Sequence, residues 1–151
     1  MGRIVRLWVV VGICINAAAP ALAQQPSPAG RIKVVSGEAV VVRAGHTIPA
    51  QSGITVYASD SLRTGDDGRV GVTLADDTLV SIGPRSEVRL DAFTYEPAQG
   101  QLGLVLQFIR GTAAYVSGRI AKLAPDAVRL ETPAAIVGVR GTTVAVQVTP
   151  D

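Results

Sequence analysis

Apolar residues alternate with polar or small residues along four segments of the chain. Because successive side chains of a β-strand point to opposite faces, this period of two predicts strands with one buried face and one solvated face. The residues predicted to face the core are Val70, Val72 and Leu74; Val88, Leu90 and Ala92; Val128 and Leu130; and Val144, Val146 and Val148.

Segment 102–109 carries apolar residues on both faces of the predicted strand. Leu102, Leu104, Leu106 and Phe108 share one face, and Val105 and Ile109 lie on the other. We therefore expect this strand to be the most buried one. Segment 117–126 has room for a short helical turn, but Gly118 and Pro125 bound it closely, so a loop is expected there.

Glycine closes several of the predicted strands, after an apolar and then a polar residue. The phrase recurs at 42–45, 62–65, 109–111 and 139–141. Glycine takes a positive φ at a turn without steric cost, so each phrase predicts the end of a strand. The spacing of the phrases is uneven. The pattern therefore predicts an all-β fold, either an irregular β-solenoid or a two-layer β-sandwich of short strands.

The N-terminus has the three zones of a secretory signal peptide. Arg3 and Arg6 precede the apolar run 7–15, and the segment ends in small residues up to Ala23, after which cleavage is predicted. The run is shorter than the about 18 residues that span a bilayer, and no later run is longer, so no transmembrane segment is expected in the mature chain. The predicted domains are a signal peptide at 1–23, a flexible tether at 24–30 and a β-domain at 31–151. The protein is expected to be periplasmic or secreted.

Removal of the signal changes the charge and the cysteine content. Loss of Arg3 and Arg6 from the 14 basic residues leaves 12 of them to balance 12 acidic ones. No basic cluster remains that would favour nucleic acid as a partner. The single cysteine, Cys14, lies in the signal, so packing without disulfides must hold the exported domain.

Two segments carry a resemblance to a known family. Asp60-Ser61-Leu62-Arg63-Thr64-Gly65 and, more specifically, Thr132-Pro133-Ala134-Ala135-Ile136-Val137-Gly138-Val139-Arg140-Gly141-Thr142 resemble the FecR domain. The resemblance spans roughly 34–148 and implies a periplasmic all-β module, most similar to the stand-alone secreted members. Asp76-Asp77 stands where the family commonly has Asp-Gly. Relatives usually continue into more strands after the Arg-Gly-Thr segment, so an open sheet edge is expected here.

Catalytic chemistry finds little support in the sequence. His46 is the only histidine, and it stands beside Gly45 in an apparent turn. Ser86 lacks the second glycine of a nucleophile elbow. The acidic pairs 66–67 and 76–77 flank one predicted strand and would lie roughly 20 Å apart, which favours solvated turns over a paired-carboxylate site. No catalytic residue, metal site or cofactor is predicted.

The candidate contact residues for a ligand or partner are Phe93, Tyr95 and Arg140. If Val88, Leu90 and Ala92 face the core, the same alternation turns Phe93 and Tyr95 outward as a possible stacking pair. A bend near 96–97 that lays both rings under the next loop is the favoured alternative. Arg140 suits a carboxylate or phosphate, or an acidic neighbour that closes a turn.

The sequence thus predicts a non-catalytic binding module of the FecR domain type that contacts a protein or a cell-envelope polymer. In the regulators that give the family its name, the resemblance implies passing a signal from an outer-membrane receptor to a cytoplasmic sigma factor. This chain would need a separate membrane partner to take that role. A third hypothesis, an envelope-associated hydrolase, has no catalytic motif in its favour.

Overall fold

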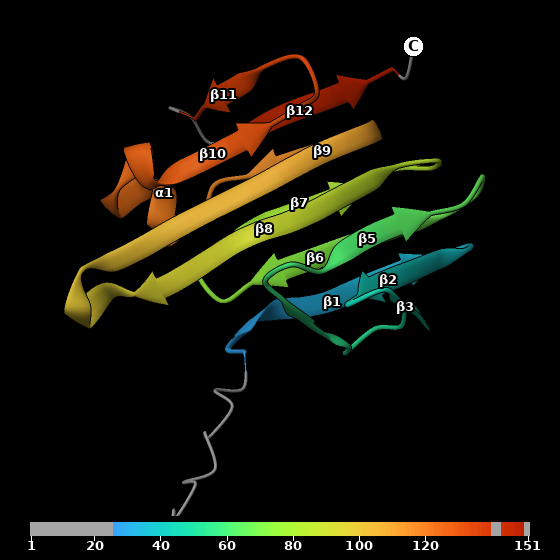
Figure 1. Ribbon diagram of the computed structural model, residues 1–151, viewed down its shortest axis with the longest axis horizontal. Helices are drawn as coiled ribbons and strands as arrows, with labels where there is room; N and C mark the ends of the chain where they lie inside the picture. The colour runs from blue at the N-terminus through green and yellow to red at the C-terminus, as the bar shows by residue number, and fades with distance from the viewer. Residues whose placement is uncertain (1–25, 140–142, 150–151) are drawn as a thin grey trace, which may run out of the picture.

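The computed structural model describes residues 26–139 and 143–149 (Figure 1). The predicted signal peptide and Arg140 lie outside these residues. The elements are β1 (Pro28–Ser36), β2 (Ala39–Arg43), β3 (His46–Pro49), β4 (Thr55–Tyr57), β5 (Ser61–Thr64), β6 (Arg69–Leu74), β7 (Leu79–Ile82), β8 (Glu87–Glu96), η1 (Pro97–Gln99), β9 (Gln101–Val116), α1 (Arg119–Leu123), η2 (Pro125–Ala127), β10 (Val128–Glu131), β11 (Ile136–Gly138) and β12 (Thr143–Val148). The prediction of an all-β fold is confirmed.

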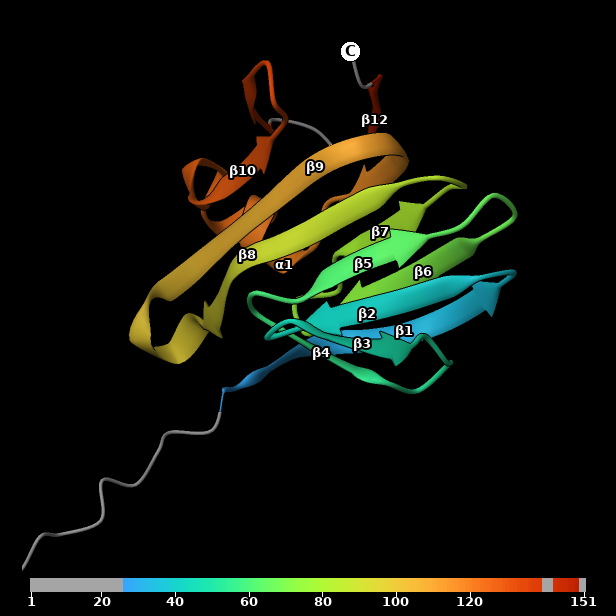
Figure 2. The same cartoon turned by 45° about the vertical axis from the view of Figure 1, so that its right-hand side comes forward.

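The strands form one curled sheet that folds over into two layers (Figure 2). One layer has the order β3-β2-β5-β8-β9-β10-β11, and the other has the order β4-β1-β6-β7-β9-β12. Neighbouring strands pair antiparallel in both layers except for β9 and β10, which are parallel. Because the coils of a parallel β-helix stack with parallel pairing, this pattern matches the two-layer alternative and not the solenoid.

The long strand β9 belongs to both layers because it bends at Gly111. Residues up to Arg110 pair with β8, whereas residues from Gly111 onward pair with β12 and residues from Ala113 onward also pair with β7. Gly111 has a φ of 82°, and a Cβ there would overlap the hydroxyl of Ser86. The sequence predicts a strand end at 109–111. The structure instead uses the glycine to turn one strand from the first layer into the second.

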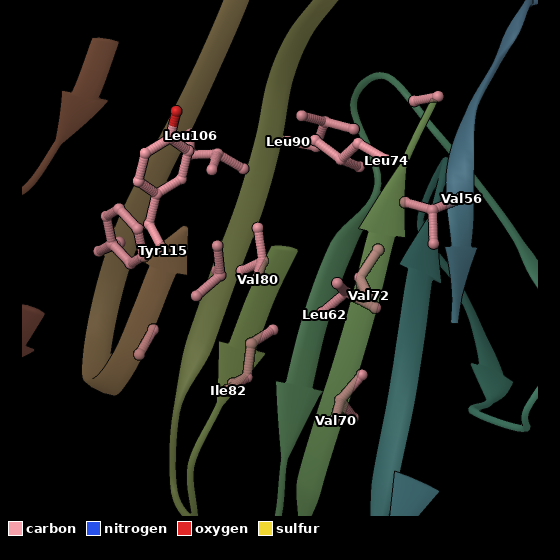
Figure 3. Close-up of a cluster of buried hydrophobic side chains, with 14 of the residues drawn as sticks. Val56, Leu62, Val70, Val72, Leu74, Val80, Ile82, Leu90, Leu106 and Tyr115 are labelled. Atoms are coloured by element: carbon pink, nitrogen blue, oxygen red, sulfur yellow. The ribbon is translucent and has the colours of Figure 1, made fainter. Parts of the chain in front are cut away.

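The core lies between the layers, where the labelled side chains of Figure 3 converge. Val70, Val72 and Leu74 are buried while the residues between them are more exposed, as their alternation predicts. On β9, Leu104, Leu106 and Phe108 are buried. Val128 and Leu130 of β10 are also buried. Hydrophobic alternation therefore predicts these strands correctly.

Two segments have a secondary structure that differs from the one predicted from the sequence. Residues 119–123 form the single-turn helix α1 where a loop is predicted, with Ile120 fully buried. Strand β1 begins at Pro28, inside the predicted tether. Ala29 is fully buried there, and its backbone forms a hydrogen bond that joins this segment to the rest of the fold. Within the described ranges no helix combines the length and apolar character needed to cross a bilayer.

Candidate functional site

A β-bulge in β8 decides where Phe93 and Tyr95 point. Leu90 lies opposite Leu106, but Ala92 lies opposite Val105, so Asp91 is an extra residue in this strand. The bulge shifts the alternation by one position. The prediction that Ala92 faces the core is wrong, since it is exposed.

Phe93 and Tyr95 consequently turn to the inner side of the sheet. They lie opposite Leu104 and Leu102 of β9, are half-buried and pack against the core. The outward alternative is therefore wrong. The favoured alternative, in which both rings are covered, agrees better with their partial burial, but a bulge at Asp91 and not a bend near 96–97 turns them. At this end of the molecule the β8–β9 hairpin reaches past the neighbouring strands (Figure 1). The partial burial of both rings indicates that the inner side is not fully covered here.

The two aromatic residues line an open hollow of about 410 Å³, here called the aromatic groove. Its lining comes from the end of β8, from η1 and the start of β9, and from the facing layer at the beginning of β1 and the turn after β6. The lining residues are Ser27, Pro28, Ala75, Phe93, Thr94, Tyr95, Glu96, Gln99 and Gln101. The bulge thus turns both sequence-predicted aromatic candidates, which share one face of β8, toward this concave site.

The lining combines aromatic surface with hydrogen-bonding groups, one of which is charged. Gln99 and Gln101 offer amide donors and acceptors, Ser27 and Thr94 offer hydroxyls, and Glu96 contributes a carboxylate. Such a mixture suits a ligand with flat apolar faces and many polar edges, as in a sugar or an extended peptide.

Arg119 of α1 is an exposed side chain that interacts with Asp77 and Tyr95. Its Nε is 2.9 Å from Oδ2 of Asp77. A hydrogen bond with the Tyr95 side chain, and then the charge of Asp77, raise the pKa of the Arg119 guanidinium above its ordinary value. Arg119 carries no functional signal in the sequence, because nothing local links it to Tyr95.

Asp76 fixes the helix that carries Arg119. Its carboxylate is fully buried and accepts hydrogen bonds from the amide of Thr78 (3.1 Å), the hydroxyl of Thr78 (2.8 Å) and the amide of Ile120 (3.2 Å). Its carbonyl accepts the Arg119 amide at 2.7 Å. The prediction of solvated turns therefore holds for 66–67 but is wrong for Asp76. The Asp-x-Thr spacing is a local turn signal, whereas the contact to Ile120 is long-range.

Of the two single residues weighed for catalysis, Ser86 is held in a structural role and His46 is exposed. Ser86 is fully buried, and its hydroxyl donates to the Pro84 carbonyl at 2.8 Å and accepts from the Thr112 amide at 2.9 Å. His46 is exposed at the start of β3. In the described part of the chain, no three His, Cys, Asp or Glu side chains are grouped so as to hold a metal ion.

A known family model matches most of the chain. Residues 60–151 match the family model described as FecR protein. The match begins at Asp60, just before β5, and includes Phe93, Tyr95 and the predicted contact Arg140. No curated protein and no solved structure matches the chain. The family resemblance of the segments 60–65 and 132–142 is thereby confirmed.

Proposed function

The chain belongs to the FecR family, and we propose from this that it is a non-catalytic binding module of the cell envelope whose aromatic groove receives a protein segment or an envelope polymer. The family indicates a signalling-related role in the periplasm. The proposal adds a ligand-binding surface on this chain to that general role.

The observation that carries the proposal is the inward turn of Phe93 and Tyr95 at an uncovered end of the sandwich. The bulge interrupts the regular pairing of β8 with β9, exposes Ala92 and directs both rings into the groove. Bulges often change the direction of side chains next to functional sites.

We further propose that export precedes binding. Residues 1–23 would be removed after Ala23, which releases a periplasmic or secreted protein. N-terminal sequencing of the protein recovered from a periplasmic fraction should give Gln24 as the first residue. A protein that retains Met1 and stays in the cytoplasm would contradict this part of the proposal.

Cosedimentation with insoluble peptidoglycan tests the groove. The exported wild-type protein should pellet with the polymer, and Phe93→Ala together with Tyr95→Ala should reduce the bound fraction at least tenfold. Tyr95→Phe keeps the ring and should retain most of the binding. Thr47→Ala changes an exposed residue of β3 outside the groove and serves as the matched control. Equal binding of the groove variant and the control would rule out the groove as the polymer site.

Signalling through a separate membrane partner is the second candidate, and the family match favours it. In this case the groove receives a segment of a protein. A photo-crosslinking residue placed at Gln99 should then capture one membrane protein in cells, and the same residue at Thr47 should not. Polymer binding without such a crosslink would favour the first candidate and exclude this one.

A further inference from the structure

The two outer faces of the sandwich differ in their charges. In the layer β3-β2-β5-β8-β9-β10-β11, three exposed arginines pair with acidic neighbours: Arg63 and Arg110 contact Glu87, and Arg89 contacts Asp91. In the layer β4-β1-β6-β7-β9-β12, the outward-facing residues of the described strands include arginines but no acidic residue. The outer face that β1, β6, β7 and the second part of β9 form in this layer is here called the basic face.

Strand pairing arranges the outward residues of the basic face in rows that run across the strands. One row is formed by Arg31, Thr73, Leu79 and Val116, and the next row by Val34, Gly71, Ser81 and Ala114. Ser36 and Arg69 pair in the row beyond, which Gly83 and Thr112 continue. The two arginines therefore lie on either side of a middle row whose residues, apart from Val34, are small.

The small residues of the middle row leave an open hollow of about 470 Å³ in the basic face. All four residues of this row line the hollow, together with Arg69 and Thr112 of the neighbouring row. The hollow thus combines aliphatic surface with one guanidinium and two hydroxyl groups. It shares no lining residue with the aromatic groove, so it is a separate site.

Two large apolar side chains are exposed at the basic face. Val34 is 61% exposed and lines the hollow, and Leu79 is 44% exposed in the neighbouring row. Ile32 faces the core, and regular alternation would turn Val34 inward as well. The bulge that adds Lys33 between them turns Val34 outward instead. Exposed apolar surface of this kind is typical of a contact with a protein or a membrane.

The positive charge of this face is not neutralised. Among the described residues, Arg31, Lys33 and Arg69 form no ion pair. The acidic residues nearest to them in the sequence lie in turns at the strand ends, where Asp67 accepts the Glu38 amide at 3.1 Å and Asp77 pairs with Arg119. The basic face therefore combines exposed apolar surface with positive charge that is available to an anion.

We propose that the basic face docks on the surface of a lipid bilayer that contains anionic phospholipid. Val34 and Leu79 enter the boundary between headgroups and acyl chains, and Arg31, Lys33 and Arg69 contact phosphate groups. Part of one lipid molecule fills the hollow, with its phosphate beside the guanidinium of Arg69. The contacts of each kind are few, so binding is reversible and weakens as the salt concentration rises.

A bilayer matches both properties of this face. Apolar side chains gain from leaving water, whereas long arginine and lysine side chains keep their charged ends at the level of the headgroups. A hydrophilic anion, whether a free phosphate or a sugar polymer, would pair with the arginines but leave Val34 and Leu79 in water. The single sign of charge suits a partner that is anionic over its whole surface, as a bilayer with anionic lipid is. An acidic protein segment is the alternative partner, which vesicle binding distinguishes.

Cosedimentation with vesicles tests the basic face. The probe is a vesicle of equal parts phosphatidylglycerol and phosphatidylcholine, and vesicles of phosphatidylcholine alone lack the anionic charge. All proteins are recovered after export, so they share one N-terminus. One variant carries Arg31→Glu with Arg69→Glu, and another carries Val34→Ser with Leu79→Ser. The control, Arg89→Glu with Arg129→Glu, reverses two exposed arginines on the outer face of the other layer. Circular dichroism with thermal unfolding verifies that each variant folds.

The wild type should pellet with the anionic vesicles and far less with the neutral ones. Charge reversal on the basic face should lower the partition coefficient by roughly tenfold or more. The serine variant should lower it by roughly fivefold or more, because less apolar area enters the interface. The control should stay within roughly twofold of the wild type, because salt screens charges on the far face. The groove variant Phe93→Ala with Tyr95→Ala should bind vesicles like the wild type.

Other results would assign this face differently. A wild type that does not bind anionic vesicles, equal binding to neutral vesicles, or an equal loss in the control would each overturn the proposal. Release of the bound wild type by soluble glycerol phosphate would make the hollow a site for free phosphate. Absence of vesicle binding, together with capture of a protein by a photo-crosslinking residue at Leu79, would make the face a protein interface instead.

Discussion

Arg43 donates a hydrogen bond to each oxygen of the Asp60 carboxylate, from Nε to Oδ1 at 2.9 Å and from Nη2 to Oδ2 at 2.7 Å. The same Nη2 donates to the Thr55 carbonyl at 2.9 Å, and the guanidinium carbon lies 4.6 Å from the centre of the Tyr57 ring. Asp60 is 1% exposed and also accepts the Tyr57 amide at 2.9 Å. The hydrogen bond to Asp60 raises the pKa of Arg43. This pair ties β2 to the connection between β4 and β5, and so joins the two layers at one edge.

Replacement of Asp60 should therefore weaken the fold. Asp60→Asn removes the charge that faces Arg43 and turns one acceptor into a donor, and we expect the free energy of unfolding to fall by about 2 to 3 kcal/mol. This is below the full cost of breaking a buried pair, because Arg43 is 35% exposed. Urea denaturation measures the change.

The matched control for this pair is Arg63→Lys. Arg63 meets Glu87 at 3.0 Å, but the Arg63 side chain is 45% exposed. The loss should stay below about 1 kcal/mol, as for other surface pairs. Equal losses in Asp60→Asn and Arg63→Lys would show that the Arg43–Asp60 pair is not a structural clamp.

The strands are the part of the fold that the sequence predicts well. Val70, Val72 and Leu74 alternate without interruption, and burial on one face is decided by that period alone. The family resemblance is likewise carried by local segments, and the match to residues 60–151 confirms it. The aromatic pair Phe93 and Tyr95 can be selected from the sequence because few aromatic residues are present.

The orientation of that pair could not be predicted, because it depends on one inserted residue. Nothing in the sequence around Asp91 distinguishes a bulge from a regular strand, and the bulge is visible only in the pairing with β9. The burial of Asp76 likewise depends on Ile120, 44 positions along the chain. Gly111 resembles a strand end because the same residue type serves turns and sharp bends.

The neighbouring residues Asp76 and Asp77 should respond very differently to the same substitution. Asp76→Asn replaces one of the acceptor oxygens that the Thr78 and Ile120 donors require, and should lower the free energy of unfolding by about 2 kcal/mol. Asp77→Asn breaks only an ion pair with Arg119 between side chains that are 63% and 62% exposed. Asp77 has a φ of 67°, which Asn also tolerates.

Chemical denaturation together with amide hydrogen exchange checks this contrast. Asp76→Asn should accelerate exchange at Ile120, and Asp77→Asn should change stability by less than about 0.5 kcal/mol. If Asp77→Asn is the more damaging variant, Asp76 does not anchor α1.

Alkaline pH should destabilise the protein through Tyr115. Burial raises the pKa of its phenol above the ordinary 10.0. Above about pH 10 the unfolded chain has released this proton while the folded protein still holds it, so the unfolded state binds fewer protons and stability falls as pH rises. Below pH 10 this contribution is constant.

Comparison with Tyr115→Phe isolates this effect. The variant has no phenol at this position, so its free energy of unfolding should decline less between pH 9 and pH 11 than that of the wild type, as measured by urea titration at each pH. The neutral-pH difference between the two proteins is subtracted. An identical alkaline decline in both would assign the effect to other groups.

Some glycines of the described residues have a positive φ and leave no room for a Cβ atom. Among these, Gly111 should tolerate substitution least. Gly111→Ala combines a φ of 82° with overlap of the new Cβ on the Ser86 hydroxyl and backbone. Since Ser86 is itself held by Pro84 and Thr112, it has no direction in which to move. We expect a loss of about 3 kcal/mol or more, from left-handed strain together with overpacking.

Gly100→Ala provides the control that separates the two causes. Gly100 has a similar φ of 68°, but a Cβ there meets no atom within 4 Å. Only the backbone strain remains, so the loss should be about 1 to 2 kcal/mol. Thermal and urea unfolding of both variants give the difference, which measures the crowding at the bend of β9. A smaller loss for Gly111→Ala than for Gly100→Ala would mean that β9 can pass from one layer to the other without this close contact.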